Sequence, residues 1–421
     1  MSTFTFDLFR RAVTDRDAIR LRGLLDSNPE LKLRIDEPLF AFDTPAIVHA
    51  AGGGSREVIE VLIAAGADVN ARSRWWAGSF GVLDSADPAL SDYLIQRGAV
   101  LDVHASARLG MLEKLQELIS AQPELVHARG GDGRTPLHFA STVEIADYLL
   151  TQGADIDAVD IDHESTAAQY LVESHPEIVR YLIQRGCRTD ILLAVAIGDA
   201  SLVRKHLDSA PECIRTRVNE QYFPKSDSRS GGTIYTWTLG MNKSVLEIAR
   251  KFDRTALLKD LIERSPAGLQ LVDALRTNDN HAAKTLLATY PDLMQTLSDQ
   301  DRREIVYAAK DNEAETVRLM LEYGWPSDGG QPETPLHWAA FHGNARMASE
   351  ILRHKPLLER RDPEFGATPL GWAIHGSLHG WHCKTGSYAE VVESLMKAGA
   401  AAPEQIGGSD AVKEVLRRYC R

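Results

Sequence analysis

Cysteine is scarce in this chain, and its few occurrences show no pairing pattern. Cys187, Cys213, Cys383 and Cys420 lie far apart in the sequence. Neither the short spacings of a zinc knuckle nor a disulfide framework is present. This pattern favours a reducing compartment, and we expect a cytoplasmic protein.

Long apolar runs are also missing. No stretch reaches the roughly 18 apolar residues that a membrane helix needs, so we expect no membrane partner and no membrane span. The opening residues MSTFTFDLFRRAV lack a basic stretch followed by a continuous apolar run, so we expect no export signal. They begin instead a degenerate helical repeat that ends near Leu25.

Positive charge is in deficit: 47 Lys and Arg face 59 Asp and Glu, a net charge of −12. Such a surface repels phosphate backbones, and no basic stripe with interleaved aromatics compensates, so nucleic acid is not an expected partner. The motifs of the nucleophile elbow, the phosphate loop, the dinucleotide fold and the protein kinases are missing too. We therefore expect no cofactor. Catalysis without such a motif stays an open alternative.

A repeated motif is what the chain does contain. The segment 334–340, TPLHWAA, aligns with 368–374, TPLGWAI, and with 135–141, TPLHFAS. Thr caps a helix through its hydroxyl, Pro suits the first helical position, and paired Ala permits close helix approach. The turn GADVNA at 66–71 returns as GADIDA at 153–158. Each repeat is thus predicted to be a pair of helices followed by a turn that projects as a finger.

The apolar pair near the end of each second helix serves as a ruler for counting repeats. It marks twelve units, ending near Leu25, Ile63, Ile95, Ile119, Leu150, Ile183, Leu207, Ile262, Leu287, Leu321, Leu352 and Met396. Against a repeat of about 33 residues, the short spacings indicate truncated fingers and the two longest mark insertions. Insertions are where function is most often found.

These motifs resemble the ankyrin repeat family, in the degenerate form found in bacteria. The resemblance implies an all-α solenoid of about twelve helix pairs with short β-hairpin fingers, and it covers nearly all of 1–421 as one domain. Residues 1–25 and 409–421 are expected to cap its ends with polar faces. The family also implies recognition of a protein partner through the finger tips and the concave face of the inner helices.

The first insertion, 211–243, is predicted to be an enlarged β-hairpin finger. Its residues 233–239, TIYTWTL, are β-branched and aromatic, which favours a strand. On alternating pleats Tyr235 and Trp237 would share one face. Arg217 belongs to a locally basic stretch that would attract an acidic group. Packing of both aromatics onto neighbouring repeats is the alternative that the sequence leaves open.

The second insertion, 375–388, splits the last repeat and is rich in His, Trp and Gly. By alignment with the preceding repeat, Phe341, His342 and His375 face the concave surface, joined by Trp381 and His382. His375, His379, His382 and Cys383 have the side-chain types of metal ligands, and histidines that bond to the backbone are the alternative. We expect no metal, because glycines weaken a helix here. The TPLH histidines His138 and His337 are expected to be structural, and Trp338 and Trp372 to pack rather than to stack on a ligand.

The sequence therefore predicts a cytoplasmic binding scaffold for a protein partner. The predicted contact residues are Arg217, Tyr235, Trp237, Phe341, His342, His375 and Trp381. The alternative is an enzyme or ligand sensor for a small polar molecule, such as a carbohydrate, held between the enlarged finger and the last two repeats. In that case His342, His375 and His382 would be the catalytic candidates.

Overall fold

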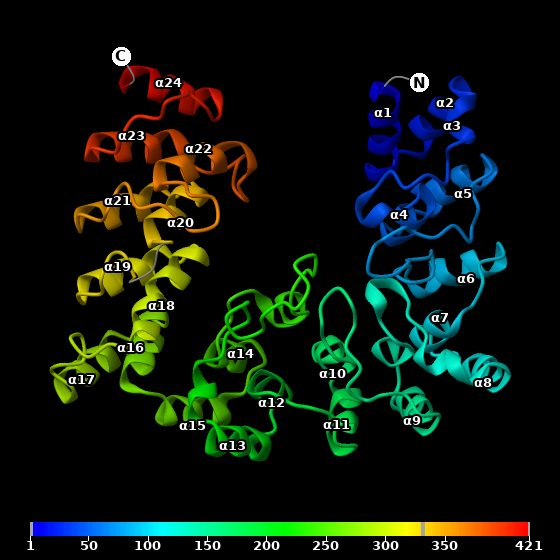
Figure 1. Cartoon of the computed structure of the whole chain (residues 1–421), viewed down its shortest axis with the longest axis horizontal. Coiled ribbons are helices and arrows are strands. Elements are labelled where there is room, and N and C mark those ends of the chain that lie inside the picture. The colour runs from blue at the N-terminus through cyan, green and yellow to red at the C-terminus, as the bar shows by residue number, and fades with distance from the viewer. Residues whose placement is uncertain (1–2, 330–332, 420–421) are drawn as a thin grey trace. The chain divides into compact units, whose positions relative to one another are not determined.

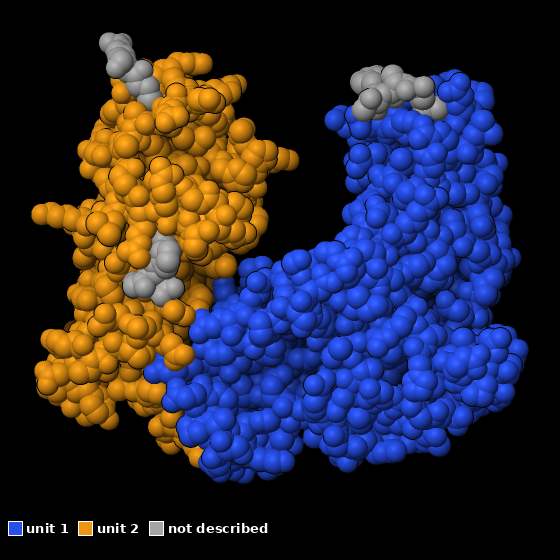
Figure 2. Space-filling model, in the orientation of Figure 1, with its two compact units in different colours: residues 1–257 blue, residues 258–421 orange. Residues whose placement is uncertain are grey.

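The computed structural model describes residues 3–329 and 333–419. The chain divides into two compact units, residues 1–257 and 258–421 (Figure 2). The boundary falls within one helix, α15 (Thr255–Arg264). Each unit is described by itself below. Whether the chain forms one continuous solenoid stays a prediction.

The first unit consists of short helices joined by turns (Figure 1). Its elements are α1 (Thr3–Thr14), α2 (Ala18–Ser27), α3 (Pro29–Lys32), η1 (Ala41–Asp43), α4 (Ala46–Gly52), α5 (Arg56–Ala64), α6 (Pro88–Gln96), α7 (Val103–Arg108), α8 (Leu112–Ala121), η2 (Pro123–His127), η3 (Gly131–Gly133), η4 (Pro136–Phe139), α9 (Val143–Thr151), α10 (Ala167–Leu171), α11 (Pro176–Gln184), α12 (Ile191–Ile197), α13 (Ala200–Ser209), η5 (Pro211–Arg215), η6 (Thr236–Gly240), α14 (Val245–Lys251) and the start of α15 (Thr255–Arg264).

The second unit is built in the same way. After the end of α15 it holds α16 (Ala267–Arg276), α17 (Asn280–Thr289), α18 (Asp299–Lys310), α19 (Ala314–Glu322), α20 (Pro335–His342), α21 (Ala345–Arg353), α22 (Pro369–His379), α23 (Tyr388–Ala398) and α24 (Asp410–Tyr419). The first helices α18, α20 and α22 pack against one another in a row, and α19, α21 and α23 form a second row. This is the two-row stacking that a helical repeat produces.

The twelve ruler residues all lie in second helices, from α2 through α23. The repeat register read from the sequence is therefore confirmed. The unit ending in α6 departs from the pattern, because residues 73–87 before it form turns and no regular first helix. No helix in the described part of the chain combines the length and apolar character needed to cross a bilayer.

The TPLH motif starts its helix by a reciprocal cap. The Thr334 amide donates to His337 Nδ1 at 3.1 Å, and the Thr334 hydroxyl lies 2.9 Å from the same nitrogen. His337 Nε2 contacts the Ala367 carbonyl of the next finger at 3.2 Å. His138 repeats this arrangement between Thr135 and the Ser165 carbonyl. Both histidines therefore join neighbouring repeats, as the sequence predicted.

Burial of the ring lowers the pKa of both TPLH histidines, and that of His138 falls to about 3. A neutral ring suits the geometry, because Nδ1 accepts from the Thr amide while Nε2–H donates to the carbonyl.

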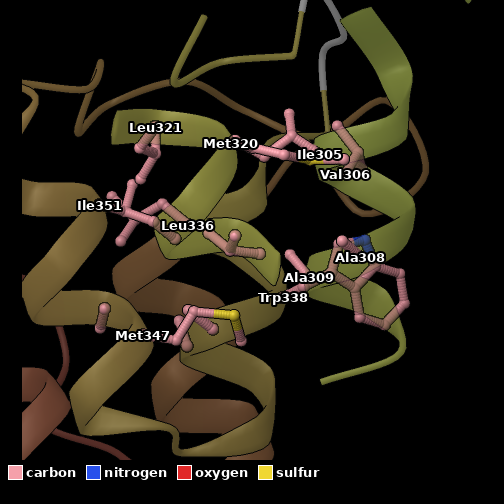
Figure 3. Packing of buried hydrophobic residues seen from close by; sticks show 14 of the residues in the cluster. Ile305, Val306, Ala308, Ala309, Met320, Leu321, Leu336, Trp338, Met347 and Ile351 are labelled. Carbon is pink, nitrogen blue, oxygen red and sulfur yellow. The ribbon is translucent and has the colours of Figure 1, made fainter. Parts of the chain in front are cut away.

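The core of the second unit runs between the two rows of helices. Ile305, Met320, Leu336, Met347 and Ile351 are fully buried there, from four successive helices (Figure 3). Alanines such as Ala309 and Ala339 let the first helices approach closely. Trp338 belongs to the same cluster and lies beside α18 in Figure 3. The core thus fixes the position of α20 and of its Trp338 side chain.

The enlarged finger does not contain the predicted strand. Residues Thr236–Gly240 form a single π-helical turn, and pairing in the described residues is limited to isolated bridges, among them Arg217 with Ser244. Tyr235 and Trp237 consequently point to different sides: Tyr235 is 0 % exposed and Trp237 is 58 % exposed. The β-branched residues favoured an extended chain, but contacts with the neighbouring finger determine the conformation instead.

Candidate functional site

A cavity of about 420 Å³ opens on the second unit, between the first helices and their fingers. Its wall is aromatic, with carboxylates and one lysine at the edge. The lining residues are Lys310, Glu333, Trp338, Phe341, Glu364, Phe365, Ala367, Gly371, Trp372, His375 and Trp381. The volume lies within the range of small-ligand sites, about 300–1,000 Å³.

Successive repeats deliver the aromatic wall. Trp338 and Phe341 come from α20, Trp372 and His375 from α22, and Trp381 from the turn that follows α22. The tryptophans of α20 and α22 occupy the same position of the TPLH and TPLG motifs, so repeat stacking brings their rings to a centroid distance of 5.0 Å. Both tryptophans pack, as the sequence predicted, and they also line the cavity.

Trp381 completes the aromatic cluster from outside the repeat. Its ring stacks on Trp338 with centroids 6.0 Å apart and meets Phe341 edge to face at 5.3 Å. It nevertheless stays 58 % exposed, and Phe365 on the next finger is 70 % exposed. Two large aromatic side chains therefore stand at the rim of the cavity without being covered.

Carboxylates accept hydrogen bonds from the indole N–H groups of Trp338 and Trp372, the two inner tryptophans. Trp338 Nε1 donates to Glu333, and Trp372 Nε1 donates to Asp362 at 3.0 Å. Asp362 also accepts the backbone N–H of Glu364 and Phe365 at 2.9 and 2.7 Å, which holds the finger that carries them. Burial raises the pKa of Glu333, because the carboxylate has lost much of its water.

Lys310, the last residue of α18, is the lysine among the described lining residues. Its Nζ lies 4.7 Å from the centroid of the Trp338 ring, a cation–π contact within the wall itself. The backbone carbonyl oxygen of Lys310 lies 2.9 Å from His342 Nε2.

His342 does not face the cavity, contrary to the prediction. It is 3 % exposed, and burial lowers its pKa. Its Nδ1 has no hydrogen-bond partner among the described residues, and its ring lies 5.3 Å from that of His382. Neither His342 nor His382 lines the cavity, so of the three catalytic candidates only His375 does.

The second insertion is partly a helix extension. α22 continues through Gly376 to His379, and the rings of His375 and His379 lie 4.9 Å apart on one face of it. The expectation that glycines weaken the helix here fails at Gly376, which α22 passes through, whereas the helix does end at Gly380. Close packing requires glycine at position 376. A Cβ at Gly376 would lie 2.7 Å from the Phe341 carbonyl oxygen and 2.9 Å from the Tyr388 ring. The Tyr388 hydroxyl donates to that carbonyl at 2.8 Å, which ties α23 to α20.

In the first unit, two predicted contact residues of the enlarged finger are buried. Arg217 is 2 % exposed, donates to the Asn242 carbonyl at 2.7 Å and pairs with Glu247 at 3.3 Å. The Tyr235 hydroxyl donates to Asp190 at 2.9 Å. Both therefore stabilise the base of the insertion and present no side chain to a partner, so the prediction of surface contacts is wrong for them.

The insertion is anchored on the finger of an earlier repeat. The Gly231 amide donates to the Asp162 carbonyl at 2.9 Å, and His163 Nδ1 lies 2.9 Å from the Gly232 carbonyl. Trp237 places its ring 4.7 Å from the His163 ring, and Arg229 lies over Trp76 at 4.1 Å. The exposed face of Trp237 is thus held in a fixed place.

One group of metal-ligand types lies beneath this anchor. Side-chain atoms of Asp132, Asp162 and His163 all lie within 4.8 Å of one another. Arg134 approaches Asp132 at 3.8 Å and His163 approaches Asp162 at 3.6 Å. The cluster therefore already contains a cationic partner, Arg134, for one of its carboxylates.

Sequence reasoning found Phe341, His375 and Trp381 and missed the other half of the cavity. The signal that could have identified Glu333, Glu364 and Phe365 is their position, because each precedes a TPL motif by a few residues. That position places them at a finger beside the first helix of the repeat.

Comparison with known proteins agrees with this architecture. A family model described as ankyrin repeats (3 copies) matches residues 103–192 and 305–405. The ankyrin repeat domain of human ASB11, a crystal structure, matches with 17% identity over 72% of this chain and 100% of that chain, at a TM-score of 0.26. A score that low carries no argument. The family match spans TPLH motifs in both units, and the helix pairs stack in the register those motifs predict. The chain therefore contains ankyrin repeats, which the family model matches over residues 103–192 and 305–405.

Proposed function

We propose that this protein is a binding scaffold and that the aromatic cavity of the second unit is where a partner protein is anchored. Ankyrin repeats generally mediate protein–protein interaction. The observation that carries the location is the pair of uncovered aromatics at the cavity rim, Trp381 at 58 % and Phe365 at 70 % exposure. Aromatic side chains beside a pocket are the usual centre of a protein interface.

The proposed contact residues are the following. Trp381, Phe341 and His375 line the cavity and remain proposed contacts. Trp237 of the first unit is exposed and remains a proposed contact of its own surface. A cytoplasmic location also remains a proposal.

A small-molecule ligand is the second candidate. Its support is the cavity volume of about 420 Å³, which suits a ligand as well as a side chain. This candidate is the enzyme or ligand sensor for a small polar molecule that the sequence left open.

The test compares three single variants in affinity capture followed by direct binding measurements with the captured protein. Trp381→Ala removes the rim aromatic, and Leu378→Ala removes a similarly exposed side chain of α22 that does not line the cavity. Trp237→Ala tests the first unit. We expect Trp381→Ala to weaken partner binding by at least about tenfold, the effect of a hot-spot residue, and Leu378→Ala to leave it unchanged.

Equal binding by the wild type and Trp381→Ala would refute the cavity as the anchor. Loss of partner binding with Trp237→Ala alone would show that the interface lies on the first unit. Circular dichroism spectra of each variant confirm that a loss of binding is not a loss of fold.

A further inference from the structure

The inner tryptophans offer a ligand only their ring faces. Both indole N–H groups are already committed, that of Trp338 to Glu333 and that of Trp372 to Asp362. A ligand that seeks hydrogen-bond donors from the wall, such as a carboxylate or a phosphate, finds none on these rings. An anionic acceptor at the N–H also increases the electron density of the ring, which strengthens attraction for a cation above its face.

The charges around the cavity point in the same direction. Glu333 and Glu364 line it against the single positive charge of Lys310. Burial raises the pKa of Glu333, and a cation brought close to it acts in the opposite direction by favouring the ionised carboxylate. A net charge of −12 on the whole chain adds long-range attraction for a basic partner.

Lys310 shows that a cation fits against this wall. Its ammonium group lies 4.7 Å from the Trp338 ring centroid. One face of the aromatic cluster therefore already holds a positive charge supplied by the protein itself, while the exposed ring of Trp381 carries no such contact among the described residues.

We propose that the cavity recognises a cationic side chain, an alkylammonium or guanidinium group, presented by a basic segment of the partner protein. This inference rests on the proposed function and specifies its ligand chemistry. The cation would lie against Trp381 and the other ring faces, with Glu333 and Glu364 as its counter-charges. An aliphatic side chain of the same shape would fill the same space without the electrostatic gain.

The experiment measures binding of three probes to the full chain by tryptophan fluorescence and calorimetry. The probes are N-acetyl-arginine amide, N-acetyl-Nε-trimethyllysine amide, and the neutral isostere of the latter in which carbon replaces the ammonium nitrogen. We expect at least one cationic probe to bind about tenfold more tightly than the neutral isostere, and added salt to reduce the difference.

Two variants separate charge from shape. Glu333→Gln keeps an acceptor for the Trp338 N–H, so the wall is preserved while the charge is lost; we expect cation binding to fall several-fold and isostere binding to stay constant. Lys310→Met removes the internal cation and should tighten cation binding, an opposite effect that simple loss of structure would not produce. Glu390→Gln, an exposed glutamate outside the cavity, is the matched control.

The outcomes distinguish this inference from the proposed function. Equal affinity for the neutral isostere, or no binding of either cationic probe up to its solubility limit, overturns the cation inference. The anchor proposal then still stands if Trp381→Ala abolishes partner binding. It fails separately if that variant binds the partner normally.

Discussion

The different environments of Tyr235 and Trp237 lead to a direct test of how the enlarged finger folds. A strand would place these two side chains on the same face, with similar burial. The structure instead forms a π-helical turn in which Tyr235 is 0 % and Trp237 is 58 % exposed. Substituting each residue should therefore have very different effects on stability.

The magnitudes follow from the contacts. Tyr235→Phe keeps the ring, including its edge-to-face contact with Phe223 at 5.4 Å, and removes only the hydrogen bond to Asp190 at 2.9 Å. Burial raises the pKa of Asp190, and a typical hydrogen bond contributes about 0.5–1.5 kcal/mol, so we expect a loss of about 1 kcal/mol in the free energy of unfolding. Tyr235→Ala should cost about 3–5 kcal/mol, as for other large buried aromatics.

Trp237→Ala should cost about 1 kcal/mol, because it removes mainly the contact with the His163 ring at 4.7 Å. The assay is urea unfolding of the full chain, followed by far-UV circular dichroism, with hydrogen exchange of the α12 amides as a local measure. Tyr235 reaches Asp190, whose other carboxylate oxygen caps α12 through the Leu193 amide at 2.9 Å. Loss of protection should therefore appear in α12.

A double-mutant cycle isolates the hydrogen bond. Asp190→Asn retains an oxygen for the Leu193 amide but replaces the oxygen that accepts from the Tyr235 hydroxyl with an amide NH2 group. We expect a coupling of about 1 kcal/mol or more between Tyr235→Phe and Asp190→Asn. The reasoning is refuted if Tyr235→Phe is neutral and additive with Asp190→Asn, or if Trp237→Ala costs as much as Tyr235→Ala.

Two further predictions concern the repeat motif and the glycines of the second insertion. The pKa of His138 falls from 6.5 to about 3 in the folded chain, so its stabilising effect is present above pH 6.5 and is lost as the pH falls toward 3. Relative to His138→Gln, which cannot be protonated, the wild type should lose about 1.4 kcal/mol per pH unit below 6.5 in unfolding measurements, and parallel pH profiles would contradict this. Gly376→Ala should destabilise the chain by about 1–3 kcal/mol through its clash with the Phe341 carbonyl. The control Gly23→Ala, in a helix with no heavy atom within 4 Å of the new Cβ, should stabilise it by about 0.5–1 kcal/mol, and similar effects of the two variants would refute the packing argument.

The repeat register was predictable because its signals are local. The Thr, Pro and His of TPLH cap a helix and bond to the next finger wherever they occur, so residues such as His138 and His337 could be assigned from the motif alone. The apolar pairs of the second helices follow helical periodicity, which sequence shows directly.

The conformation of the insertions was not predictable, because contacts far apart in sequence determine it. Thr233–Leu239 has the composition of a strand, yet Ser165 binds the Ile234 amide at 3.1 Å and Asp190 binds the Tyr235 hydroxyl. Both partners lie more than 40 residues earlier, so no local pattern reports them. Propensity of this kind gives way to tertiary contacts.

The same distinction explains the cavity. Alignment of repeats placed Phe341 and His375 correctly, because equivalent positions of stacked repeats lie side by side. The same alignment also predicted that His342 lies on the surface, because its position within the repeat is normally exposed. The second insertion changes that surface: its turn brings Trp381 and His382 over His342, with the Trp381 ring 5.5 Å from the histidine. The insertion therefore buries one predicted contact and supplies another in its place, which is why the exposed Trp381 is the residue whose removal tests the binding surface most directly.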